Sequence, residues 1–280
     1  MERGVTLPTA TVSCHRYRHN NHMEKTMNKK NMMLLALCMA ATTGWAQEDD
    51  FGLWGEVNVE KKINSRWSAG AGVEFRSRDN AGEADRWSVG ADVTYKITDW
   101  LKASAGYTLL DDHRHKVNNS GKKYADYWGL RHRFNLSLTG AYSIGDLSIS
   151  LRERWQYTYR PAKTVQRYWN YTDDDDDIYY GDPVPDKAGT DPHTYGIKVK
   201  NVWRNRLQLK YKLNKTWRPY ASVETNVSHG LEKIRYAAGT EIRLSKKHWL
   251  DAKYLFQTCP NDDDDEGNRH IISLGYTYKF

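Results

Sequence analysis

The sequence predicts an all-β protein, an antiparallel up-and-down transmembrane β-barrel of about 10–12 strands that follows a cleavable signal peptide. Three observations predict it: a polar composition rich in aromatic side chains, a secretory leader, and a last strand of alternating polarity. The mean hydropathy of −0.84 excludes a bundle of membrane helices, whereas 19 Tyr and 11 Trp exceed the aromatic content of a disordered chain. A barrel reconciles the two, because each strand gives half of its side chains to lipid and half to a polar interior.

The leader lies near the start of the chain. Lys29 and Lys30 precede an apolar run over 32–41, and Gly44-Trp45-Ala46 offers small residues where a signal peptidase cleaves. The run is too short to span a bilayer as a helix, which needs roughly 20 residues. We therefore expect an upstream extension of the gene model over 1–26, a signal peptide over 27–46 and the barrel over 47–280.

Removing this leader changes the charge balance. Residues 1–46 hold six Lys/Arg and two Asp/Glu, so the rest of the chain keeps 36 of 42 basic and 33 of 35 acidic side chains. The net charge falls from +7 to +3, which removes the compositional support for nucleic-acid binding. Cys14 and Cys38 leave with the leader, and Cys259 by itself cannot form an internal disulfide.

Alternation of polarity predicts about eleven strands of roughly ten residues each. In the second, Trp67, Val73 and Phe75 share the apolar face, while Glu74 and Arg76 share the polar one. The segments are 51–61, 67–78, 86–96, 100–110, 128–142, 147–160, 197–212, 217–228, 234–244, 249–258 and 269–280.

The last segment ends on an aromatic residue, as the assembly signals of outer-membrane barrels do. Its apolar face ends in Tyr276, Tyr278 and Phe280. We expect the barrel-assembly machinery to bind these residues during insertion.

The connections between segments alternate between short and long. Short turns on the periplasmic side and long external loops are typical of outer-membrane barrels. Four tryptophans directly follow a short turn, which predicts an aromatic girdle at one membrane depth. These are Trp67, Trp100, Trp217 and Trp249.

Two features do not fit a regular barrel. Eleven strands is an odd number, whereas bacterial single-chain barrels have an even one, so either residues 51–61 are no ordinary wall strand, giving ten, or a twelfth was missed. In addition, His132, Glu153, Asn201 and Asn205 fall on the lipid-facing phase. Bulges that flip the phase are one explanation, and contact with a partner or a lipid headgroup is the other.

Arginine pairs two residues apart mark the inward face, since this spacing keeps both guanidinium groups on one side of a strand. The pairs are Arg76/Arg78, Arg131/Arg133, Arg152/Arg154 and Arg204/Arg206, and the inward carboxylates that we expect to compensate them are Glu74, Asp92, Glu224 and Glu241. Two interpretations stay open: a structural ion-pair network in a narrow barrel, or a site for an anion such as phosphate, a carboxylate or a lipid headgroup. General diffusion is not expected, because open porins use 16 or more strands.

Signals for an enzyme are weak, and we expect no catalytic residue, metal or cofactor. No His has a Ser two residues later, the arrangement of an outer-membrane phospholipase. Asp111, Asp112 and His113 imitate the Asp/His pairing of an outer-membrane protease, so a hydrolase acting on lipid or peptide is the alternative function. His113-x-His115 and the acidic runs 173–177 and 262–266 are interpreted as rim and loop decoration, with weak cation contact as the alternative for the runs.

Several short segments resemble the barrel family catalogued as domain of unknown function 2490. They are Phe51-Gly-Leu-Trp-Gly-Glu56, Arg131-His-Arg-Phe134, Arg152-Glu-Arg-Trp-Gln156 and Arg204-Asn-Arg-Leu207, together with the Phe280 ending. The likeness covers roughly residues 50–280. It implies an outer-membrane barrel and no particular reaction.

The sequence as a whole therefore predicts a non-enzymatic barrel in the outer membrane of a Gram-negative bacterium. Its expected role is structural, or the binding or passage of a small anionic solute or lipid through an Arg-lined lumen. The expected partners are outer-membrane lipid and lipopolysaccharide, with no nucleic acid.

Overall fold

The computed structural model describes residues 49–118, 123–169, 171–172, 178–179, 190–260 and 267–280. No helix in these residues is long and apolar enough to cross a membrane. The strands are β1 (Asp50–Lys62), β2 (Trp67–Arg78), β3 (Glu83–Lys96), β4 (Leu101–Val117), β5 (Lys123–Ile144), β6 (Leu147–Arg160), β7 (Lys163–Trp169), β8 (Tyr171–Thr172), β9 (Ile178–Tyr179), β10 (Thr190–Tyr195), β11 (Lys198–Tyr211), β12 (Trp217–Val227), β13 (Leu231–Arg243), β14 (His248–Thr258) and β15 (Arg269–Lys279).

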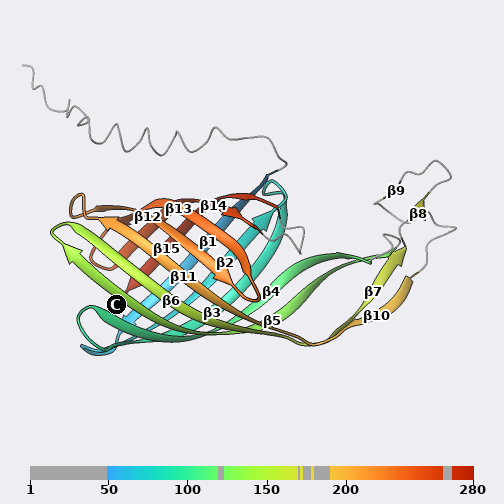
Figure 1. Cartoon of the computed structure of the whole chain (residues 1–280), viewed down its shortest axis with the longest axis horizontal. Helices are drawn as coiled ribbons and strands as arrows, with labels where there is room; N and C mark the ends of the chain where they lie inside the picture. Colours follow the sequence, from blue (N-terminus) through green and yellow to red (C-terminus); the bar gives the residue numbers. More distant parts are fainter. Residues whose placement is uncertain (1–48, 119–122, 170, 173–177, 180–189, 261–266) are drawn as a thin grey trace, which may run out of the picture. The chain divides into compact units, whose positions relative to one another are not determined.

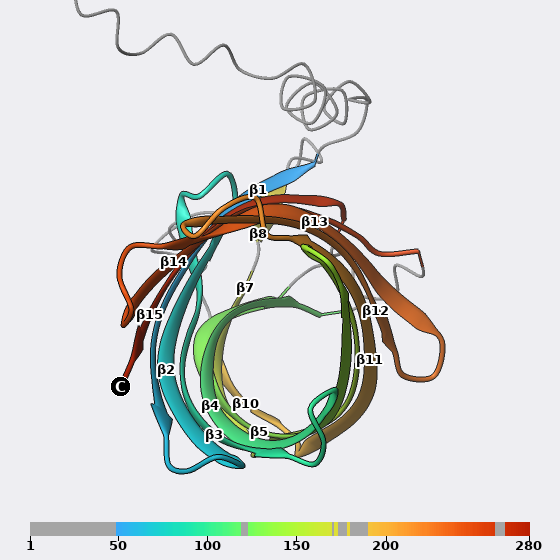
Figure 2. The ribbon, with the colours of Figure 1, turned by 90° about the vertical axis from the view of Figure 1, so that its left-hand side faces the viewer.

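Eleven strands form a closed barrel, seen end-on in Figure 2. The sheet runs in the order β5-β4-β3-β2-β1-β15-β14-β13-β12-β11-β6, and pairing of β5 with β6 closes it. Each of the predicted segments coincides with one of these strands, which confirms the predicted fold. β4 and β5 extend further than expected, to Val117 and from Lys123.

The odd strand number is accommodated by a parallel seam. β1 pairs with β15 in parallel, from Asp50 opposite Arg269 to Glu60 opposite Lys279. The Phe280 N–H donates to the Glu60 carbonyl at 2.9 Å, and the Lys62 N–H donates to the Phe280 carbonyl at 3.2 Å. Both expected explanations, ten strands or twelve, are therefore wrong: residues 51–61 are a wall strand, and a parallel pair lets an odd number close.

Side chains alternate between the outer surface and the lumen as the sequence predicts. The apolar phase is exposed on the outside, with Trp87 at 56%, Leu136 at 54% and Leu274 at 54% of their full exposure. The opposite phase carries the charged and hydroxyl side chains that line the lumen. The core is thus polar and the outer surface apolar, the reverse of a soluble domain.

Two register shifts interrupt this alternation. They lie at Arg76/Ser77 in the β2–β3 pair and at Asn226/Val227 in the β12–β13 pair. The β5–β6 and β6–β11 pairs run without a shift. The bulge explanation for the polar residues on the outward phase, His132, Glu153, Asn201 and Asn205, is therefore wrong.

The short turns share one hydrogen-bonding device. The Asn64 side-chain oxygen accepts from the Arg66 and Trp67 N–H groups at 2.8 Å, and Asn214 does the same for Thr216 and Trp217. The Thr98 hydroxyl accepts similarly from the backbone N–H of the first residue of β4. These Asx- and ST-type turns tighten the end of the barrel that we call the short-turn end, and the other is the long-loop end.

Two strands continue the barrel sheet beyond the wall at the long-loop end (Figure 1). β7 pairs with β10 and with the start of β5, at Lys123 opposite Trp169. Asp191 on β10 forms ion pairs with Arg167 and Lys123. The acidic runs 173–177 and 262–266 and the leader over 1–46 lie outside the described residues.

Candidate functional site: the charged lumen

A cavity of about 580 Å³ lies in the barrel lumen and is lined by every barrel strand except β15. Its lining is dominated by charged side chains, with nine cations and six carboxylates. The cations are Arg76, Arg133, Arg152, Arg154, Arg204, Arg206, Lys210, Arg235 and Lys253, and the carboxylates are Glu56, Glu74, Asp92, Glu224, Glu241 and Asp251. The cavity wall therefore carries an excess of positive charge.

The excess arises from strand pairing. On the β6–β11 pair, Arg154 lies opposite Arg204 and Arg152 lies opposite Arg206. Like charges directly across two strands repel each other, and low-dielectric surroundings strengthen that repulsion. The register of β6 and β11 thus concentrates four guanidinium groups on one side of the lumen.

Glu224 on β12 is the main compensating charge. Its side chain is 8% exposed and forms ion pairs with Arg152 at 2.6 Å, with Arg204 through a short contact and with Arg235 at 3.5 Å. The β12 register sets this arrangement, because Glu224 lies opposite Arg206 on one side and Arg235 on the other. One carboxylate therefore serves three guanidinium groups.

Other carboxylates pair locally. Arg76 donates two 2.8 Å hydrogen bonds to Glu74 and lies 3.8 Å from the centre of the Trp54 ring. Lys210 pairs with Glu241. Asp92 also lines the cavity but forms no ion pair within 4.0 Å among the described residues.

Three of the arginines that line the cavity, Arg133, Arg154 and Arg206, have no carboxylate partner within 4.0 Å in the described part of the chain. Arg154 donates to the Ser137 hydroxyl at 2.8 Å. The Nε atoms of Arg133 and Arg206 are buried and have no hydrogen-bond partner there. Buried guanidinium donors without acceptors are the chemical signature of a place for an anion.

The lumen is packed at the long-loop end. Asp112 is 2% exposed and is held by Arg86, Arg131 and Arg114, the last at 3.4 Å. Leu110, on the same strand as Asp112, and Ile271 on β15 are each 1% exposed. None of these buried side chains lines the cavity.

The predicted site residues are distributed as follows. Six of the eight predicted arginines and all four predicted carboxylates line the cavity. Arg131 does not line the cavity and forms an ion pair with Asp112. The predicted inward position of Arg78 is wrong. The bulge after Arg76 moves Arg78 to the opposite face, where its side chain donates a hydrogen bond to Glu83. The search for Arg-x-Arg pairs missed single inward cations such as Arg235, although their phase in the strand was visible in the sequence.

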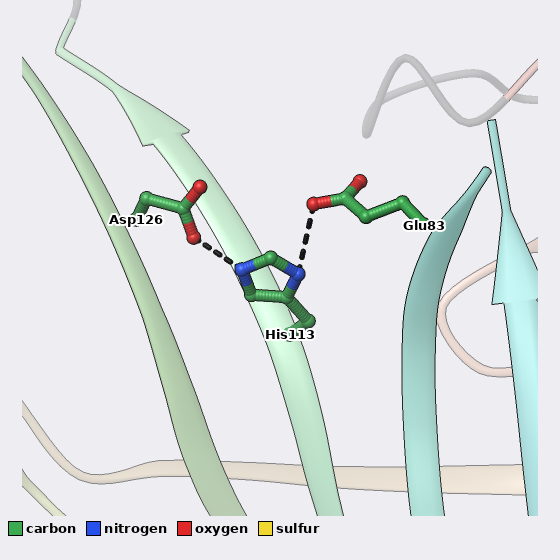
Figure 3. A group of neighbouring side chains, drawn as sticks. All are labelled: Glu83, His113 and Asp126. Carbon is green, nitrogen blue, oxygen red and sulfur yellow. Dashed lines mark hydrogen bonds and ion pairs between the residues drawn. The ribbon is translucent and has the colours of Figure 1, made fainter.

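Among the described residues, His113 forms the protease-like pairing with neither Asp111 nor Asp112. Adjacent residues point to opposite faces of a strand, so Asp112 is inside and His113 outside. His113 instead contacts Glu83, 2.8 Å from its Nδ1 atom, and Asp126 at its Nε2 atom (Figure 3). This second cluster, at the long-loop end of the outer surface, joins β3, β4 and β5.

The four predicted girdle tryptophans divide into two groups. Trp67, Trp100 and Trp217 are exposed on the outer surface at the short-turn end. Trp249 shares its strand phase with Asp251 and Lys253 and lies under Arg218, 4.7 Å from its ring centre, so it faces the lumen. The membrane girdle stays a prediction for the other three.

Comparison with known proteins identifies the family but no activity. The family model described as Protein of unknown function (DUF2490) matches residues 51–268. Compared with curated proteins, the chain has no match.

Solved structures offer distant likenesses. The β domain of the Bordetella autotransporter Brka is 15% identical, with a TM-score of 0.47 over 83% of this chain and 82% of that one. The translocator domain of autotransporter NalP from Neisseria meningitidis is 13% identical, with a TM-score of 0.46 over 82% and 88%. The NanC porin is 13% identical, with a TM-score of 0.40 over 74% and 85%. Likeness at this level carries no argument about function.

Proposed function

We propose that this chain, which belongs to the DUF2490 family of proteins of unknown function, is an outer-membrane barrel that binds small anions in its lumen. The observation that carries the proposal is the set of three arginines, Arg133, Arg154 and Arg206, without a carboxylate partner around an internal cavity. A purely structural network would pair each lumen guanidinium, because an unpaired buried charge costs several kcal/mol, about 3–5 when one partner of a pair is removed.

The apolar outer surface supports the membrane location. A ring of exposed side chains such as Trp87 and Leu274 would be unfavourable in water, at about 25 cal/mol per Å² of apolar surface. Lipid removes that cost. On this proposal residues 27–46 direct export, and lipopolysaccharide and outer-membrane lipid surround the barrel.

The packed long-loop end favours binding over free passage. A solute crossing the lumen would have to displace the Asp112 cluster, in which one carboxylate holds three guanidinium groups. Such a charge-assisted network is strong, and we infer that it hinders passage at this end. We therefore expect low ion conductance and measurable anion binding.

The test is isothermal titration calorimetry of the folded barrel in detergent with inorganic phosphate and with succinate. We expect binding of at least one of these anions, weakened about tenfold or more in Arg133→Gln, because a lost charge-assisted hydrogen bond is worth about 1.5–3 kcal/mol. The control is Arg66→Gln, since Arg66 lies exposed in a short turn and bonds Tyr95. Absence of anion binding, or equal binding in both variants, would refute the proposal. Tightly bound lipid in the purified protein would identify a lipid headgroup as the anion.

A further inference from the structure

We propose that Glu83, His113 and Asp126 form a binding site for a divalent transition metal, with Zn²⁺ as the best match, on the outer surface of the barrel. The ligand atoms of the three residues all lie within 4.8 Å of one another. They come from three adjacent strands, β3, β4 and β5, and Figure 3 shows the two carboxylates on either side of the imidazole, Glu83 at Nδ1 and Asp126 at Nε2. This cluster lies outside the lumen and is independent of the anion proposal.

Neighbouring groups orient two of the three ligands, His113 and Glu83. The His113 ring stacks on Trp128 with centroids 4.9 Å apart and an interplanar angle of 7°. Arg78 donates to the Oε2 atom of Glu83 at 2.8 Å and to the His113 carbonyl at 3.3 Å. The Oε1 atom of Glu83 is thereby turned toward the imidazole. Such supporting contacts are what hold metal ligands in a productive orientation.

One ligand atom is poorly satisfied in the metal-free arrangement. The Nδ1 atom of His113 is buried and lacks a partner with hydrogen-bond geometry, although the Glu83 carboxylate lies 2.8 Å away. In the tautomer that carries its proton on Nε2, toward Asp126, the Nδ1 atom is available to a metal ion that the Glu83 carboxylate also reaches. The Asp126 side chain is 44% exposed, so its carboxylate can rotate to complete the set.

The donor set selects the class of metal. One imidazole nitrogen with two carboxylate oxygens suits Zn²⁺, whereas Ca²⁺ and Mg²⁺ prefer ligand sets made of oxygen alone. Three protein ligands leave the fourth tetrahedral position to water or to an oxygen of an anionic ligand. The exposure of Glu83 and Asp126, at 35% and 44%, leaves that position accessible from outside.

The sequence gives no motif for this site. Glu83, His113 and Asp126 are far apart along the chain, and only the register of β3, β4 and β5 brings them together. His115, the nearest histidine, does not join the cluster and stacks on Tyr124 at 5.9 Å. The proposed site departs from the sequence-based interpretation of His113-x-His115 as rim decoration, because it uses His113 as a ligand.

The experiment titrates Zn²⁺ into the folded, EDTA-treated barrel in detergent and follows heat release and melting temperature. We expect one strong site per chain and a melting temperature that rises with Zn²⁺, because binding to the folded state stabilises it. His113→Ala should weaken binding about tenfold or more, in line with the loss of a ligand or its support. His115→Ala is the matched control and should bind as the unaltered chain does.

A heat-modifiability gel shows whether His113→Ala folds. If it does not, Asp126→Asn, which keeps the shape of the side chain, is used in the same titration. Undetectable Zn²⁺ binding would overturn the proposal, as would equal binding in His113→Ala or Asp126→Asn and the unaltered chain. Binding of Ca²⁺ in preference to Zn²⁺ would overturn the assignment of the metal class.

Discussion

Glu224 is a single carboxylate that forms ion pairs with three guanidinium groups. Its neighbours Arg204 and Arg206 lie opposite further arginines on β6. Removing the carboxylate would leave Arg152, Arg204 and Arg235 without their anionic partner while they remain buried. At the scale of single residues, the stability of the barrel should therefore depend strongly on this position.

We predict that Glu224→Gln lowers the free energy of unfolding by about 3 kcal/mol or more, the cost of breaking a buried ion pair. Glu241→Gln is the matched control, since Glu241 pairs with Lys210 alone and is 29% exposed. Its effect should be about 1 kcal/mol, closer to that of an exposed pair. Urea unfolding in lipid vesicles, followed by tryptophan fluorescence, measures the free energy of unfolding of both variants. Equal losses of this free energy would contradict the special importance of Glu224.

At the scale of single strands, a bulge in β2 and the two strands outside the barrel wall depart from the regular barrel. The bulge after Arg76 sends Arg78 to the outer face, where it supports Glu83 and His113. The strands β7 and β10, beyond the barrel wall, depend instead on the ion pairs of Asp191. Because β10 pairs with β7 alone among the described strands, loss of these ion pairs should act on the extension and not on the barrel.

For this element we predict that Asp191→Asn speeds hydrogen exchange in residues 163–169 and 190–195 and leaves the barrel strands protected. Hydrogen bonds from Arg167 and Lys123 lower the pKa of Asp191 below its usual 3.8. A lowered pKa means that the stabilisation is present at neutral pH and is lost as the pH falls through that lowered value. The hydrogen-exchange rates of these residues in the unaltered chain should therefore approach those of the variant only at acidic pH.

The control is Thr190→Ala, an exposed neighbour on the same strand. Exchange is measured at pH 7 and, after correction for intrinsic rates, at pH 3. Faster exchange throughout the barrel, or no change in either segment, would show that Asp191 does not hold the extension.

At the scale of the whole molecule, the parallel seam decides how the barrel closes. β1 and β15 run in the same direction, and Val57 lies opposite Tyr276 on the outer face. If β1 were not a wall strand, β15 would have to pair with β2, and Val57 would lose this neighbour.

We predict that Val57→Cys combined with Tyr276→Cys forms a disulfide on oxidation, because paired residues of neighbouring strands lie within the Cα separation a disulfide spans. Cys259→Ser removes the native thiol from the background. Val57→Cys with Leu250→Cys is the control, since Leu250 lies one strand further along the wall. Gel mobility under non-reducing conditions reads the result, and cross-linking of the control pair alone would disprove the seam.

The predictions from sequence succeeded where they used properties local to a strand. A side chain's face follows from its position in the alternation, so the wall strands, the polar lumen and the short turns were all predicted correctly. The position of Trp249 was predicted on its place after a turn, yet its alternation with Asp251 and Lys253 already indicated the lumen. The alternation of Trp249 with two lumen residues was visible in the sequence, but the prediction followed the turn pattern instead.

The sequence by itself determined a barrel of about eleven strands, its apolar outside and its charged inside, because period-two alternation acts within each strand. Only the tertiary structure decided the parallel seam, the bulge that moves Arg78, and the sharing of Glu224 among three arginines. It alone brought Glu83, His113 and Asp126 together. The physical reason is register: which residues of two strands lie opposite each other depends on the closure of the whole sheet, and a shift of one residue exchanges every facing pair.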